Sequence, residues 1–104
     1  MFELMVRTWL STSGTSTARK LHDKAVMFVS AKAQAAAAGK IYPLLNGDEA
    51  TVFKRGRNSH ASSVPKASTH EEYHAATGIE TLFGYLYLNG KADRLNELFS
   101  IIIE

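Results

Sequence analysis

The chain has 104 residues, a formal net charge of +2, 45% hydrophobic residues and 21% charged residues. These values are ordinary for a globular protein and predict one domain that covers residues 1–104. The small net charge means that nucleic-acid binding would depend on local basic clusters. The absence of cysteine excludes disulfides and thiolate metal sites and favours a cytoplasmic location. No apolar run has the length of a membrane span, and Glu3 and Arg7 interrupt the first apolar stretch, unlike a signal peptide.

The first predicted helix covers residues 1 to about 11. Its apolar residues recur at helical spacing, and they are Phe2, Met5, Val6, Trp9 and Leu10. No Ser, Thr, Asp or Asn precedes the pattern as a cap, and the pattern is already complete at Met1. We therefore expect a truncated first helix.

A second helix is predicted over residues 18–38, with Thr17 as its cap and Gly39 as its end. The run of four alanines at 35–38 is typical of a closely packed helix face. Residues 40–45, which include a proline, are expected to connect it to the next helix.

Asn46 and Glu49 form a capping-box pair, which predicts a short helix that ends at about Arg55. The basic sequence KRGRN follows, and two interpretations stay open for its cations. Cations at a helix C-terminus are favoured by the helix dipole alone. Guanidinium groups at a turn around Gly56 could also make bidentate contacts with phosphate.

The segment 58–68 is polar and has no helical or strand periodicity, so it is expected to be a loop. It contains Lys66 and follows the basic KRGRN sequence, an arrangement that suits an enzyme acting on polyanions and equally an ordinary surface loop. His70 and His74 lie four residues apart, but no HExxH pattern or third ligand accompanies them, so they do not predict a metal site.

Residues 69–90 predict the central helix of the fold. Thr69 and Glu72 form a capping box at its start, and Asn89-Gly90 is a stop signal. The helix is apolar almost all round, apart from the carboxylate of Glu80. An ionised carboxylate there is costly unless a cation, a hydrogen-bond network or a mobile proton compensates it. Glu80 is therefore either a partly exposed surface charge or a site residue.

The last helix is predicted over residues 91–103, with an apolar face that packs against its neighbours or another subunit. Its buried residues are expected to be Leu95, Leu98, Phe99 and Ile102. Together the elements predict an all-α bundle of about five helices.

Four stretches of the chain resemble the ribonuclease III family. The sequence ATGIETLFGYLYLNGKADRLNEL at 76–98 is similar to the closing motif of its catalytic domain, in which a helix of pattern x-x-x-E-A-L-x-G-x-x-x-L presents a metal-binding Glu. The other three are LHDKAVMFVSAKAQA at 21–35, FKRGRN at 53–58, and VPK at 64–66 followed by EYHAATG at 72–78. They occur in order over nearly the whole chain. The GYLYL ending resembles Mini-ribonuclease III, the branch without a double-stranded-RNA-binding domain.

The resemblance implies a ribonuclease III-type helical bundle and a Mg²⁺-dependent endoribonuclease of double-stranded RNA. It also implies a cytoplasmic homodimer that matures large-subunit (23S) ribosomal RNA. The alternative is a catalytically inactive relative that binds double-stranded RNA or the ribosome.

The resemblance also assigns roles to particular residues. Glu80 is the expected metal ligand, and Glu3 is a weaker candidate on the first helix. Thr77 stands where other ribonuclease III proteins have an Asp, which favours a reduced set of ligands, and Tyr73 lies with it near the approach to Glu80. The residues expected to hold the RNA backbone are Lys54, Arg55, Arg57, Asn58 and Lys66.

One motif of the family is incomplete. Its first catalytic helix opens with G-D-A-x-[FY]-E, and Phe2 and Glu3 match the last two positions. The Asp, the main metal ligand, would lie four residues before Glu3 and therefore upstream of Met1. A GTG valine codon interpreted as a start codon would account for this. We expect the in-frame DNA upstream to encode G-D-A, and an in-frame stop codon immediately before Met1 would contradict this explanation.

Overall fold

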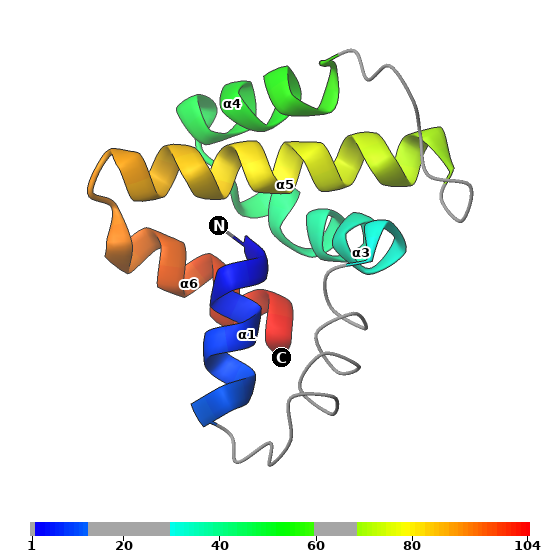
Figure 1. The fold of residues 1–104 in the computed structure, drawn as a ribbon. Helices are drawn as coiled ribbons and strands as arrows, with labels where there is room; N and C mark the ends of the chain where they lie inside the picture. Colours follow the sequence, from blue (N-terminus) through cyan, green and yellow to red (C-terminus); the bar gives the residue numbers. More distant parts are fainter. Residues whose placement is uncertain (1, 13–29, 60–68) are drawn as a thin grey trace.

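The computed structural model describes residues 2–12, 30–59 and 69–104. In these ranges the chain forms five α-helices and one short 3₁₀ helix, with no strand (Figure 1). They are α1 (Phe2–Thr12), α3 (Ala31–Ile41), η1 (Tyr42–Leu44), α4 (Gly47–Arg57), α5 (His70–Leu88) and α6 (Ala92–Ile103). The predicted all-α fold is confirmed. Of these helices, none combines the length and apolar character that crossing a membrane requires.

The longest of these helices, α5, lies at the centre of the bundle and contacts α1, α3, α4 and α6 (Figure 1). Its core residues Ile79, Leu82, Phe83 and Leu86 are fully buried. Leu88 belongs to the apolar surface that the sequence predicts for this helix, but it is 83% exposed because it occupies the last turn, beyond the packed part of the helix.

Helices α1 and α6 close the core from one side of α5. In α1 the buried residues Phe2, Val6 and Leu10 follow the predicted helical spacing. The Phe2 ring meets Phe83 of α5 edge-on, with ring centroids 5.3 Å apart, and also contacts Phe99 of α6. All four residues predicted to be buried in α6 are buried.

The prediction of one continuous helix over residues 18–38 is wrong at both ends of its described part. Ser30 has extended backbone angles (φ −61°, ψ 153°), and its hydroxyl accepts a hydrogen bond from the Ala33 N–H, so a helix starts after it. Gly39 does not end α3, which continues to Ile41 and passes into η1, where the chain meets Pro43. The predicted cap at Thr17 lies outside the described residues.

Both predicted capping boxes are confirmed. The Asn46 side chain accepts from the Glu49 N–H at 2.9 Å, and the Glu49 carboxylate accepts from the Asn46 N–H at 3.0 Å. Thr69 and Glu72 make the same reciprocal pair at the start of α5. At its other end, Gly90 has a φ of 69°, a left-handed conformation that favours glycine.

Two glycines allow α4 and α5 to pack closely. The predicted turn at Gly56 is wrong, because α4 continues through it to Arg57. A Cβ at Gly56 would lie 2.3 Å from the Thr81 hydroxyl, and one at Gly78 would lie 2.7 Å from the Phe53 ring and 3.0 Å from the Phe53 carbonyl oxygen. The absence of a side chain at these positions fixes how α4 sits on α5.

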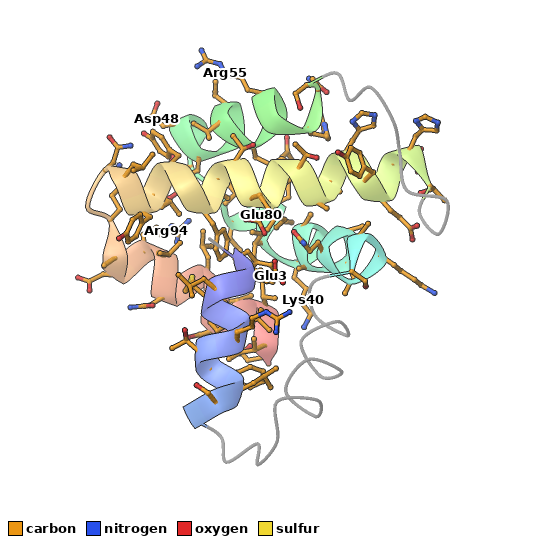
Figure 2. The ribbon with its side chains drawn as sticks, viewed as in Figure 1. Glu3, Lys40, Asp48, Arg55, Glu80 and Arg94 are labelled. Carbon is orange, nitrogen blue, oxygen red and sulfur yellow. The ribbon has the colours of Figure 1, made fainter. Side chains whose placement is uncertain are left out.

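An ion pair between the buried carboxylate of Glu49 and the partly exposed guanidinium of Arg94 connects the start of α4 to α6, and the sequence did not predict it. Glu49 is 2% exposed, and its two carboxylate oxygens accept from the Arg94 guanidinium at 2.8 and 2.9 Å. The same guanidinium donates to the Leu44 carbonyl at 2.7 Å and pairs with Glu97. The hydrogen bonds from Arg94 hold the pKa of Glu49 below its ordinary value, against the opposite effect of burial, while the pKa of Arg94 is raised. Figure 2 shows Arg94 where α5 and α6 join.

Gly78→Ala is expected to destabilise the protein by about 1–3 kcal/mol, because the new methyl group would overlap the Phe53 ring and backbone. Gly84→Ala in the same helix is the matched control. Apart from its chain neighbours and the backbone of its own helix, no described atom lies within 4 Å of its added Cβ, so stability should stay unchanged or rise by up to about 1 kcal/mol. Urea unfolding of both variants measures this, and equal midpoints would contradict the close packing of α4 on α5.

Arg94→Gln should cost about 3 kcal/mol, because it leaves the Glu49 carboxylate buried without its charged partner. Arg7→Gln removes an exposed pair with Glu3 and should cost less than about 1 kcal/mol. Chemical denaturation compares the two variants. A similar small loss for both would show that Glu49 does not depend on Arg94.

The lowered pKa of Glu49 also predicts acid sensitivity. Its contribution to stability is present above its ordinary pKa of 4.5 and is lost as the pH falls through the lower folded-state value. Denaturant midpoints measured from pH 6 down to about pH 2 should therefore decline less steeply in Glu49→Gln than in the unchanged chain. Parallel declines would contradict the lowered pKa.

Candidate active site

The half-buried carboxylate of Glu80 lies at the middle of α5, where α1 begins. Its Oε2 accepts a hydrogen bond from the Phe2 N–H at 3.2 Å. This hydrogen bond provides part of the compensation that a carboxylate in an apolar helix needs.

Glu3 lies in the first turn of α1, and Figure 2 shows it at the end of that helix which meets α5. Its side chain is exposed and forms an ion pair with Arg7 at 3.1 Å, one turn further along the helix. Such an exposed pair is worth less than about 1 kcal/mol, so it could be broken at little cost if Glu3 took another partner.

The described residues fit a Mg²⁺ ion only in part. Mg²⁺ is usually bound by one or two carboxylates, together with waters and substrate phosphate oxygens. Glu80 provides one carboxylate of the right chemistry. Within the described part of the chain, however, no group of three or more His, Cys, Asp or Glu side chains could enclose a metal ion.

Tyr73 and Thr77 precede Glu80 on α5 by seven and three residues, so the three share a helix face. The Thr77 hydroxyl donates to the Tyr73 carbonyl at 3.0 Å, a bond within the helix. The Tyr73 ring contacts the His74 ring edge-on, with centroids 6.0 Å apart. Both residues are half-buried, consistent with a position beside the carboxylate.

The predicted RNA-binding cations do not converge on Glu80 within one chain. Lys54 and Arg55 are exposed on α4, and Figure 2 shows Arg55 pointing away from α5. Helix α4 lies on the other side of α5 from α1 (Figure 1). Arg57 is half-buried over the Phe53 ring. Lys66 lies outside the described residues.

A pocket of about 430 Å³ lies between the C-terminal end of α4 and the first turns of α5. It is lined by Arg57, Asn58, Glu71 and His74. Arg57 and Asn58 were predicted from the sequence to bind RNA, whereas Glu71 and His74 were not. Glu71 and His74 lie on a different helix from Arg57, and no local pattern indicates that the chain brings them together.

Residues 1–91 match the ribonuclease III domain. The chain belongs to the ribonuclease III family. It is 38% identical over 104 residues to Mini-ribonuclease 3 of Clostridium tetani, a match that covers 99% of this chain and 69% of that protein. It is 42% identical over 98 residues to Mini-ribonuclease 3 of Symbiobacterium thermophilum, covering 94% of this chain and 75% of that protein.

A solved structure has the same fold. The crystal structure of a protein from Fusobacterium nucleatum superposes with a TM-score of 0.88 at 27% identity, and the match covers 98% of this chain and 81% of that one. The resemblance to Mini-ribonuclease III that the sequence motifs indicated is confirmed. Membership of the ribonuclease III family identifies the chain as an endoribonuclease.

Proposed function

We propose that this chain is the catalytic domain of a Mg²⁺-dependent endoribonuclease that cleaves double-stranded RNA, with a precursor of large-subunit (23S) ribosomal RNA as its substrate. We further propose that it acts as a homodimer in the cytoplasm. The observation that carries the proposal is the position of Glu80, a half-buried carboxylate on the central helix of a ribonuclease III fold.

Hydrolysis of a phosphodiester requires an activated water and neutralisation of the charge that develops on the phosphate. A bound Mg²⁺ supplies both. In the proposal Glu80 would be a ligand of this ion, because it places a half-buried carboxylate on the central helix. Glu3 is the second candidate, since breaking its exposed pair with Arg7 would release its carboxylate.

Binding of the duplex is assigned to the basic residues of α4. Double-stranded RNA is recognised mainly by its A-form shape, its phosphates and its 2′-hydroxyls. Lys54 and Arg55 are exposed and free of the core, while Arg57 and Asn58 line the pocket beside them. These residues, together with Lys66, are proposed to hold the RNA backbone.

Exposed apolar side chains support the proposed homodimer. Tyr87 and Leu88 at the end of α5 are 60% and 83% exposed, and Leu4 of α1 is 62% exposed. Large apolar side chains in such positions are available for burial between two copies of the chain.

A second candidate function is binding of double-stranded RNA without cleavage. It is favoured by one observation: the described residues place no three-residue group of metal-binding side chains around Glu80. The two candidates share the basic residues and the apolar surface, so only activity separates them.

Incubation of a long RNA duplex with Mg²⁺ distinguishes the two functions. The chain of 104 residues is compared with a form extended upstream by the in-frame coding sequence. Cleavage by the extended form alone, or by both forms, supports the endoribonuclease. Binding without cleavage by both forms supports the second function and contradicts the first.

Arg57→Glu is expected to weaken binding of an RNA duplex at low salt, because it replaces a phosphate-binding cation with an anion. The slope of log K against log salt concentration should fall by about 1. Lys32→Glu on α3 makes the same charge change at an exposed site outside the pocket and is the control. Unchanged affinity in Arg57→Glu would remove Arg57 from the RNA-binding surface.

A further inference from the structure

The pocket at the junction of α4 and α5 contains an unusual mixture of polar groups. Its lining combines the guanidinium of Arg57 and the amide of Asn58 with the carboxylate of Glu71 and the imidazole of His74. The walls are held in place by the contact of Gly56 with Thr81, which fixes the end of α4 against α5. The four groups therefore project from two helix ends whose relative position is set by close packing.

One polar atom of the lining residues lacks a hydrogen bond. Within the described part of the chain, the His74 Nδ1 is buried and has no hydrogen-bond partner. Buried polar atoms in folded proteins nearly always have one, so this nitrogen needs an explanation. The imidazole of His74, a lining residue of the pocket, therefore has hydrogen-bonding capacity that the described residues do not use.

The charges in the lining restrict the chemistry of that ligand. A simple anion would suit Arg57 and Asn58 but would be repelled by the Glu71 carboxylate. A simple cation would suit Glu71 but not Arg57. A ligand that carries an anionic group and a neighbouring hydroxyl suits all four residues, since a hydroxyl can donate to a carboxylate and can also pair with either nitrogen of an imidazole.

We propose that this pocket binds one ribose-phosphate unit of the RNA duplex, with the phosphate on Arg57 and Asn58 and the 2′-hydroxyl on Glu71 and His74. The inference rests on the proposed function, because it takes RNA as the substrate. The 2′-hydroxyl is the group by which a protein distinguishes RNA from DNA at a given position. Glu71 and His74 therefore contribute to the selection of RNA.

The pocket is separate from the carboxylate that is proposed to act in cleavage. His74 and Glu80 are six residues apart on α5, roughly 9 Å along the helix axis and about 120° around it. The ribose in the pocket is consequently not the one beside the cleaved bond. Its recognition should affect affinity and sugar preference and leave the chemistry at Glu80 unchanged.

Duplex binding without Mg²⁺ tests this inference. Dissociation constants are measured for an RNA duplex and for the same sequence with 2′-fluoro sugars, which keep the A-form but cannot donate a hydrogen bond. In the unchanged chain the RNA duplex should bind more tightly. In His74→Phe, which keeps a ring of similar size, and in Glu71→Gln at an exposed position, this RNA preference should fall by roughly threefold to tenfold. His70→Ala is the matched control, because His70 stacks on His74 but lies outside the pocket, and the preference should be retained.

The possible results distinguish a failure of the inference about the pocket from a failure of the proposed function. Binding of the RNA duplex with the same preference in the unchanged chain, His74→Phe and Glu71→Gln would overturn the inference and leave the proposed function intact. A parallel loss of affinity for both duplexes would also overturn it, since that result indicates a structural role only. Failure of the unchanged chain and the upstream-extended form to bind either duplex would overturn the proposed function itself.

Discussion

The packing of α5 on all sides is the constraint on which this structure depends. Four helices pack against it and bury its core residues, and α4 packs closely because Gly56 and Gly78 have no side chains to separate the backbones. Glu80 lies in this helix where it meets α1, and its carboxylate accepts a hydrogen bond from the Phe2 N–H. The same arrangement that builds the core therefore fixes the orientation of the carboxylate proposed to act in cleavage.

Features encoded within one turn of helix could be predicted from the sequence. The capping boxes at Asn46 and Thr69 are confirmed because both partners lie three residues apart and their geometry is local. The apolar faces of α1 and α6 are confirmed for the same reason, since their spacing alone determines which side is buried.

Features that depend on contacts between distant residues could not be predicted in this way. The sequence KRGRN was interpreted as a turn around Gly56, whereas Gly56 lies within α4 and leaves room for Thr81 of α5. The ion pair of Glu49 with Arg94 spans 45 residues, and no periodicity indicates it. The composition around Ser30 favours one continuous helix. Ser30 is instead the N-cap of α3, because its hydroxyl accepts a hydrogen bond from the Ala33 N–H.

In the candidate site, too, the local features could be predicted from the sequence and the contacts between distant residues could not. Glu80 could be singled out because a carboxylate in an apolar helix requires compensation, and the family motif gave it a role. The basic sequence of α4 was also visible, but its position was not: Arg55 points away from α5, and only Arg57 and Asn58 join a pocket. That pocket depends on His74 and Glu71, which become its neighbours only when α4 and α5 pack together.

The most direct test of the account is the rate at which the upstream-extended chain cleaves a long RNA duplex in Mg²⁺, with and without Glu80→Gln. The substitution keeps the shape of the side chain and removes its charge. The account predicts a loss of at least about 100-fold in rate, the upper range for residues that only support a metal ligand, with unchanged affinity for the duplex. Cleavage by Glu80→Gln at the unchanged rate would contradict the assignment of Glu80 as the catalytic carboxylate.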